Sequence, residues 1–191
     1  MRLLLLIICL GVTSAVATPT RGVAASQVQH LCLSQFIGTP LRPADVAGAL
    51  PNSIRLKLLA ALAQGDIAGA VSLWQVHTGR NTVPKALQAL QAAFSSANRV
   101  AGPCARVARD IYDGFKFFGG EPQYVHISST GGSYLSWQSR IMMSNNNAHL
   151  AVRHGGKIYD AFTGPAGIIE PEYLKNIHYA GEIITRTVSS P

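Results

Sequence analysis

The spacing of apolar residues changes once along this chain, and that change constrains the fold more than any other feature. From Pro43 to about Ala97 apolar residues recur at helical spacing, whereas after Gly119-Gly120 they alternate as in strands. Helices followed by a run of antiparallel strands indicate the α+β class. Since 48% of residues are apolar and 13% are charged, the composition is that of a protein with a packed core and excludes intrinsic disorder.

Residues 1–17 have the layout of a secretory signal peptide. Arg2 precedes the apolar run from Leu3 to Leu10, and Ala15-Val16-Ala17 is an A-x-A cleavage pattern. The run is too short to cross about 30 Å of hydrocarbon as a helix. We therefore expect cleavage after Ala17, a flexible N-terminal segment over 18–42, and a secreted or periplasmic protein without membrane insertion.

The segment 43–97 is expected to form a helical lobe. Asp66 is a suitable N-cap for one of its helices and Gly79 a suitable end, while Thr82 can cap the next helix with Pro84 in its first turn. A regulatory role for this lobe is an alternative, but apolar periodicity by itself favours a core-forming role.

A β-hairpin is the clearest element of the second region, 98–191. Gly155-Gly156 separates two alternating runs and favours a two-residue primed turn. Such a turn pairs 154 with 157, 153 with 158 and 151 with 160, which puts His149 and Asp160 on one face about 7 Å apart. A carboxylate beside an imidazole can hold its tautomer and stabilise its cation, although an ordinary cross-strand ion pair would give the same pattern.

Cys104 lies in the first turn of an expected helix from Cys104 to Phe115, directly after Pro103. Free backbone N–H groups and the helix dipole stabilise a thiolate at that position, and Arg106 and Arg109 add positive charge. A buried structural cysteine on the apolar face of the helix is the alternative.

The order cysteine, histidine, aspartate resembles that of the papain-fold toxin domains of bacterial polymorphic toxins. The resemblance covers roughly Asn98 to Ile177 and rests on three segments, namely Gly102-Pro103-Cys104-Ala105-Arg106, His149 to Asp160, and Gly167 to Leu174. It implies a papain-like fold for 98–191 with a Cys–His–Asp triad. By that resemblance Cys104 is the nucleophile, His149 the general base and then acid, and Asp160 the group that orients His149.

The resemblance implies an exported toxin or effector that acts on a protein or peptide and needs no cofactor, and an immunity protein is among the partners it allows. Peptidase, glutamine deamidase and transglutaminase chemistry all proceed through the same thioacyl intermediate, so the sequence does not choose among them. The N–H of Cys104 is a candidate oxyanion donor. The side chain of Asn98 is another candidate, unless it ends the preceding helix.

Three other interpretations compete for the same residues. A Cys32–Cys104 disulfide would leave a secreted, non-catalytic binding module of the same fold. The net charge of +7 would suit a basic nucleic-acid-binding toxin, but Lys and Arg are scattered without a run, so we do not expect nucleic acid as the partner. We expect no metal site, because His149 and His154 point to opposite faces of a strand.

Overall fold

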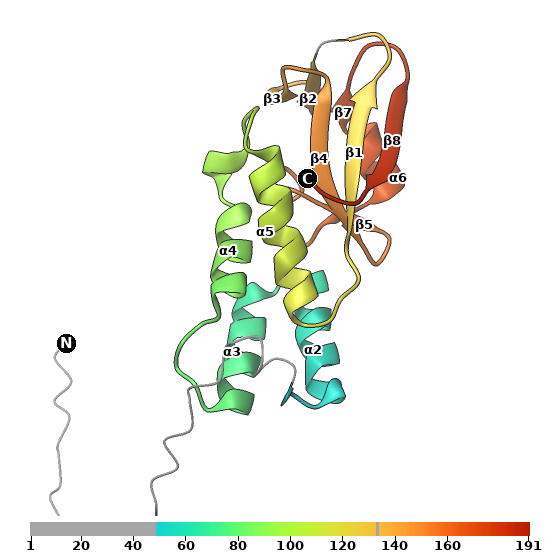
Figure 1. Ribbon diagram of the computed structural model, residues 1–191. Helices are drawn as coiled ribbons and strands as arrows, with labels where there is room; N and C mark the ends of the chain where they lie inside the picture. Colours follow the sequence, from blue (N-terminus) through green and yellow to red (C-terminus); the bar gives the residue numbers. More distant parts are fainter. Residues whose placement is uncertain (1–48, 133) are drawn as a thin grey trace, which may run out of the picture. The chain divides into compact units, whose positions relative to one another are not determined.

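The computed structural model describes residues 49–132 and 134–191, so the expected signal peptide (1–17) and N-terminal segment (18–42) lie outside the described residues. It confirms the α+β class, with helices first and antiparallel strands after them (Figure 1). The helical half contains α2 (Asn52–Ala63), α3 (Ile67–Thr78), α4 (Lys85–Ala93), the short 3-10 helix η1 (Ser96–Asn98) and α5 (Cys104–Phe117).

The strands form two antiparallel sheets. The larger has the order β6-β5-β4-β1-β8, and the smaller has the order β3-β2-β7. The larger sheet consists of β1 (Gln123–Ser129), β4 (Ala148–His154), β5 (Lys157–Tyr159), β6 (Ile168–Ile169) and β8 (Ile183–Val188). The smaller consists of β2 (Leu135–Trp137), β3 (Ile141–Ser144) and β7 (Ile177–His178), and the helix α6 (Glu170–Lys175) precedes β7.

Each face of the larger sheet carries its own hydrophobic core. Val152 and Tyr159 join the core formed with the helices, which contains Ile111 and Phe115 of α5. On the other face Ile127 packs in a second core with residues of the smaller sheet and of α6. Full burial of one large apolar side chain stabilises a fold by roughly 1.5–3 kcal/mol, so both cores hold the sheet in place.

The helix boundaries follow local capping chemistry at most of the expected positions. The Asp66 side chain accepts a hydrogen bond from the Gly69 N–H at 2.8 Å, and Gly79 ends α3 in a left-handed conformation with φ 65°. The prediction that Thr82 caps α4 is wrong. Pro84 is the N-cap residue of that helix, and no side-chain cap is formed there. Its ring already fixes a φ of −57° at the helix entrance.

The β4–β5 hairpin has the predicted register. Val152 pairs with Tyr159 and His154 with Lys157, and the turn glycines Gly155 and Gly156 have φ of 57° and 76°. The hairpin is also tied to the end of α2. The Tyr159 hydroxyl donates to the Ala63 carbonyl at 3.3 Å, and Nζ of Lys157 donates to the same oxygen at 3.1 Å.

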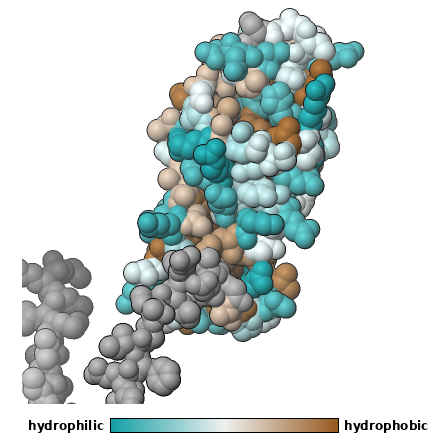
Figure 2. Space-filling view, in the orientation of Figure 1, coloured by the Kyte–Doolittle hydropathy of each residue, from teal (hydrophilic) through white to brown (hydrophobic). Residues whose placement is uncertain are grey.

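The surface drawn in Figure 2 is mostly hydrophilic or neutral, with strongly apolar residues in small areas between polar ones. None of the helices in the described part of the chain has the length and apolar character needed to cross a membrane.

Candidate active site

Cys104 occupies the first position of α5, as the sequence predicts. The first backbone bond of this helix runs from the Val107 N–H to the Pro103 carbonyl at 3.0 Å. The N–H groups of Cys104 and Ala105 therefore have no intrahelical acceptor. Because the thiol is only half-buried, it combines access to solvent with the positive end of a helix dipole.

His149 and Asp160 are in direct contact, as the hairpin geometry predicts. Nε2 of His149 lies 2.9 Å from Oδ2 of Asp160, and the two side chains are 2% and 1% exposed. His149 lies on β4 opposite Ile127 of β1, and Asp160 directly follows β5. The pair is thus held by two neighbouring strands and is shielded from water.

Both oxygens of Asp160 are fully engaged. Oδ1 accepts hydrogen bonds from the N–H groups of Phe162 and Thr163, each at 2.8 Å. Oδ2 accepts the hydroxyl of Tyr173 at 2.6 Å in addition to the contact with His149. Burial raises the pKa of Asp160, but the hydrogen bond and charge of His149, with smaller contributions from Tyr173 and Thr163, outweigh it and leave that pKa lowered. The site therefore holds a buried, ionised carboxylate.

Cys104 lines the same crevice as His149 and Asp160. Since Nε2 of His149 is bonded to Asp160, Nδ1 remains for the thiol. Nδ1 is buried and forms no hydrogen bond with any of the described residues, the thiol of Cys104 included. The pKa of Cys104 is lowered chiefly because its thiolate can accept a hydrogen bond from the neighbouring His149 ring. Burial opposes this effect, while the charge of His149 and the backbone amides of Leu150 and Ala105 lower the pKa further.

The imidazole responds in the complementary direction. Burial lowers the pKa of His149, but its hydrogen bond to Asp160, the neighbouring Cys104 thiolate and the charges of both groups outweigh burial and raise that pKa to about 9. A thiolate beside an imidazolium is the state these shifts favour near neutral pH. In a serine-protease triad Nδ1 of the histidine faces the carboxylate, whereas here Nε2 of His149 does.

The three side chains line one narrow crevice. Val100 and Phe162 form part of its walls, which leave no room for a water molecule between them. Val100 is 51% exposed and lies on the segment that leads from η1 to α5. The crevice as it stands is therefore closed even to a molecule the size of water, and the exposed Val100 lies on its wall.

The candidate role of Asn98 as an oxyanion donor is wrong for this structure. Its Nδ2 donates to the carbonyls of Ala92 and Ala93 at 2.9 and 3.1 Å, and its Oδ1 accepts from Arg106 at 2.7 Å. The side chain of Asn98 thus binds the last carbonyls of α4, close to the helix-ending role that the sequence also allowed. Arg106 is engaged with Asn98 and Asp110, and it is not among the groups that shift the pKa of Cys104.

Tyr173 is the site residue that sequence analysis missed. It lies in α6, is fully buried, and burial followed by the negative charge of Asp160 raises its pKa well above the usual value. A buried tyrosine hydroxyl needs a hydrogen-bond partner, which is a signal in the sequence. The identity of that partner depends on how α6 packs beneath the sheet, which the sequence pattern does not reveal.

Two further expectations concern the position of His154 and a disulfide at Cys104. The His154 ring contacts the Phe115 ring in a tilted arrangement, with centroids 4.6 Å apart. This places His154 on the face of β4 that packs on the helices, away from His149. Cys104 has no disulfide partner among the described residues, and the expected alternative partner Cys32 lies outside them.

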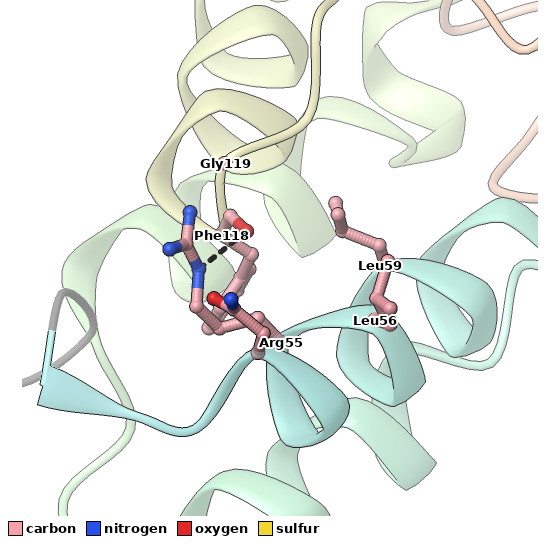
Figure 3. A pocket seen from close by; sticks show the side chains of 6 residues that line it. Arg55, Leu56, Leu59, Phe118 and Gly119 are labelled. Atoms are coloured by element: carbon pink, nitrogen blue, oxygen red, sulfur yellow. Dashed lines mark hydrogen bonds between the residues drawn. The ribbon is translucent and has the colours of Figure 1, made fainter.

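A roomier pocket lies elsewhere in the described part of the chain. It holds about 310 Å³ and lies between α2 and the end of α5, where the Arg55 Nε donates to the Phe118 carbonyl at 3.3 Å (Figure 3). None of Cys104, His149 and Asp160 lines it. Volume alone would therefore point away from the crevice in which Cys104, His149 and Asp160 meet.

Comparison with known proteins gives no match to a family model, to a curated protein or to a solved structure.

Proposed function

We propose that this protein is an exported cysteine hydrolase or acyltransferase of the papain-like type, acting as a toxin or effector on a protein or peptide. The observation that carries the proposal is the buried His149–Asp160 pair, with Cys104 in the same crevice and with the pKa of its thiol lowered by His149. Each of these groups has an ordinary structural explanation when taken alone. Their convergence on one crevice favours nucleophilic catalysis.

In the first step the Cys104 thiolate attacks the carbonyl carbon of an amide. A carbon–sulfur bond forms, the carbonyl electrons move to oxygen, and the N–H of Cys104 at the helix start is positioned to stabilise that charge. The His149 imidazolium then gives its proton to the departing nitrogen as the carbon–nitrogen bond breaks. The products are a thioester on Cys104, a free amine or ammonia, and neutral imidazole.

In the second step the neutral His149 takes a proton from water or from an incoming amine. That nucleophile attacks the thioester carbon, the carbon–sulfur bond breaks, and the thiolate–imidazolium pair is restored. Attack by water corresponds to peptidase or deamidase activity, and attack by an amine corresponds to transglutaminase activity. Asp160 keeps the ring oriented and its cation stabilised through both steps.

The first test of this proposal is the reactivity of the thiol. Cys104 should react with iodoacetamide at pH 6, where an ordinary thiol is almost entirely protonated. His149→Ala should slow this reaction strongly, while His178→Ala, at an exposed position on β7, should leave it unchanged. Peptide mapping by mass spectrometry assigns the label to Cys104. A thiol that stays unreactive at pH 6 would contradict catalysis, as would a disulfide between Cys32 and Cys104 in the mature protein.

The second test identifies the reaction. Wild type and Cys104→Ala are compared in a cell-toxicity assay, followed by mass spectrometry of cellular proteins. Backbone cleavage indicates a peptidase, conversion of glutamine to glutamate a deamidase, and new amide cross-links a transglutaminase. Equal toxicity of wild type and Cys104→Ala would overturn the proposed function.

A further inference from the structure

The segment between α4 and α5 contributes one wall of the crevice and holds an arginine at its rim. Asn98 and Val100 line the crevice, and Arg99 lies between them with its side chain exposed. Its Nε donates a hydrogen bond to the Ala161 carbonyl at 3.0 Å. Ala161 directly follows Asp160 and lines the crevice as well. The guanidinium therefore bridges two walls of the site instead of extending freely into solvent.

Most of the hydrogen-bonding capacity of Arg99 is unused. Its two terminal nitrogens, Nη1 and Nη2, have no protein acceptor among the described residues, and no carboxylate there forms an ion pair with it. Asp160, which precedes Ala161, is engaged with His149, and Asp110 of α5 is engaged with Arg106. The rim thus carries an uncompensated, anchored positive charge.

An anchored guanidinium is well suited to one kind of ligand. Its planar pair of N–H groups matches the two oxygens of a carboxylate, and fixing Nε in advance reduces the ordering that binding requires. The imidazolium of His149 is also cationic but only 2% exposed. Arg106, which bonds to Asn98 of the crevice wall, is paired with Asp110. Among the described residues, Arg99 is therefore the exposed cation at this rim that lacks a carboxylate partner.

We infer that Arg99 is a specificity-determining residue that selects acyl donors with a carboxylate close to the reacting carbonyl. The carboxylate comes from an acidic side chain or from a chain terminus. This inference rests on the proposed function and narrows its substrate class.

The test compares two alkylating agents of nearly equal size, iodoacetate and iodoacetamide, which differ in negative charge. The ratio of their rate constants with Cys104 is measured in the full chain, and it cancels any change in thiolate fraction or access that a substitution causes. Arg99→Gln should lower the iodoacetate-to-iodoacetamide ratio by about three- to tenfold, the scale expected for removal of one nearby charge in a partly solvated site. Arg186→Gln, which removes an equal charge from exposed β8, is the matched control and should keep the wild-type ratio.

The outcomes separate this inference from the proposed function. An unchanged ratio in Arg99→Gln, or an equal fall in Arg186→Gln, overturns the role of Arg99 while normal iodoacetamide reactivity still supports the nucleophile. If Cys104 of the wild-type protein reacts with neither agent, the proposed function itself is overturned. Protection of Cys104 from iodoacetamide by N-acetylglutamate amide assigns a side-chain carboxylate, and protection by N-acetylalanine assigns a terminal one. Protection by neither contradicts carboxylate selection.

Discussion

Asp160 is the residue around which the other polar groups of the site are arranged. Four donors converge on its two oxygens, from the backbone of Phe162 and Thr163 and from the side chains of His149 and Tyr173. A buried carboxylate with this many partners stays charged and cannot rotate. Its position therefore fixes the imidazole plane, and the imidazole in turn sets the state of the thiol.

Removal of one donor tests this arrangement. Tyr173→Phe should destabilise the fold by about 1.5–3 kcal/mol, the range for a hydrogen bond to a charged group. In an Asp160→Asn background the same change should cost much less, because the carboxylate charge is already gone. Urea unfolding of the four proteins measures this coupling, and Tyr179→Phe at an exposed position is the control. Equal costs in both backgrounds would show that Tyr173 acts only through packing.

The charge of Asp160 also sets the pH range of thiol reactivity. The thiolate–imidazolium pair exists above the lowered pKa of Cys104 and below about 9, where His149 loses its proton. Asp160→Asn should lower the pKa of His149, so that the imidazolium is lost at lower pH and the pKa of Cys104 rises. We expect alkylation by iodoacetamide at pH 6 to fall by up to about tenfold for each unit by which the pKa of Cys104 rises. A pH–rate profile that matches the wild type would contradict this dependence.

At the scale of elements, the turn of the β4–β5 hairpin brings His149 and Asp160 into register. Gly155 and Gly156 both have positive φ, and the space around them is open. Gly156→Ala should therefore destabilise the protein by about 1–2 kcal/mol through backbone strain alone. Gly155→Asn should be nearly neutral, because asparagine adopts the left-handed region readily. Chemical unfolding measures both, and an unchanged stability of Gly156→Ala would show that the turn does not hold the register.

The elements that the sequence revealed are those specified locally. The hairpin needs only its glycines and its alternation, and α3 needs only Asp66 and Gly79 at its ends. Asn98 is a position at which the sequence allowed two roles, because an amide near a helix end can cap the helix or point into a site. Here two carbonyls of α4 take both protons of the amide, and packing rather than sequence decided between them.

The elements that the sequence did not reveal depend on contacts between distant segments. β8 pairs with β1, so that Thr187 lies opposite Val125 some sixty positions earlier in the chain. Its middle residues are exposed and polar, which hides the alternation that normally marks a strand. Tyr173 is likewise brought to Asp160 by the packing of α6. His149 and Asp160 could be predicted as neighbours from the hairpin alone. Their proximity to Cys104 depends on the packing of α5 on β4, which the sequence pattern does not reveal.

At the scale of the whole molecule, the helices and the hairpin of the larger sheet share one hydrophobic core. A domain boundary near residue 97 would cut through that core. The core that contains Leu58 and Leu87 of the helical half also contains Val152 and Tyr159 of the hairpin. The hydrogen bonds from Lys157 and Tyr159 to the Ala63 carbonyl join the same two parts. Because Cys104 comes from the helical layer and His149 from the sheet, the candidate site requires both layers to be folded together.

The two tryptophans of the chain make this dependence measurable. Trp74 is buried in the core with the helices, and Trp137 lies in the core between the two sheets. In a Trp74→Phe variant fluorescence reports on the sheets, in a Trp137→Phe variant it reports on the helices, and far-UV circular dichroism reports on both. If the layers fold as one cooperative unit, the fluorescence and circular dichroism midpoints in urea coincide within each variant. A lower midpoint for either tryptophan alone would show that the layers unfold separately. In that case the rate of Cys104 alkylation would stop depending on His149 at the urea concentration at which the less stable layer unfolds.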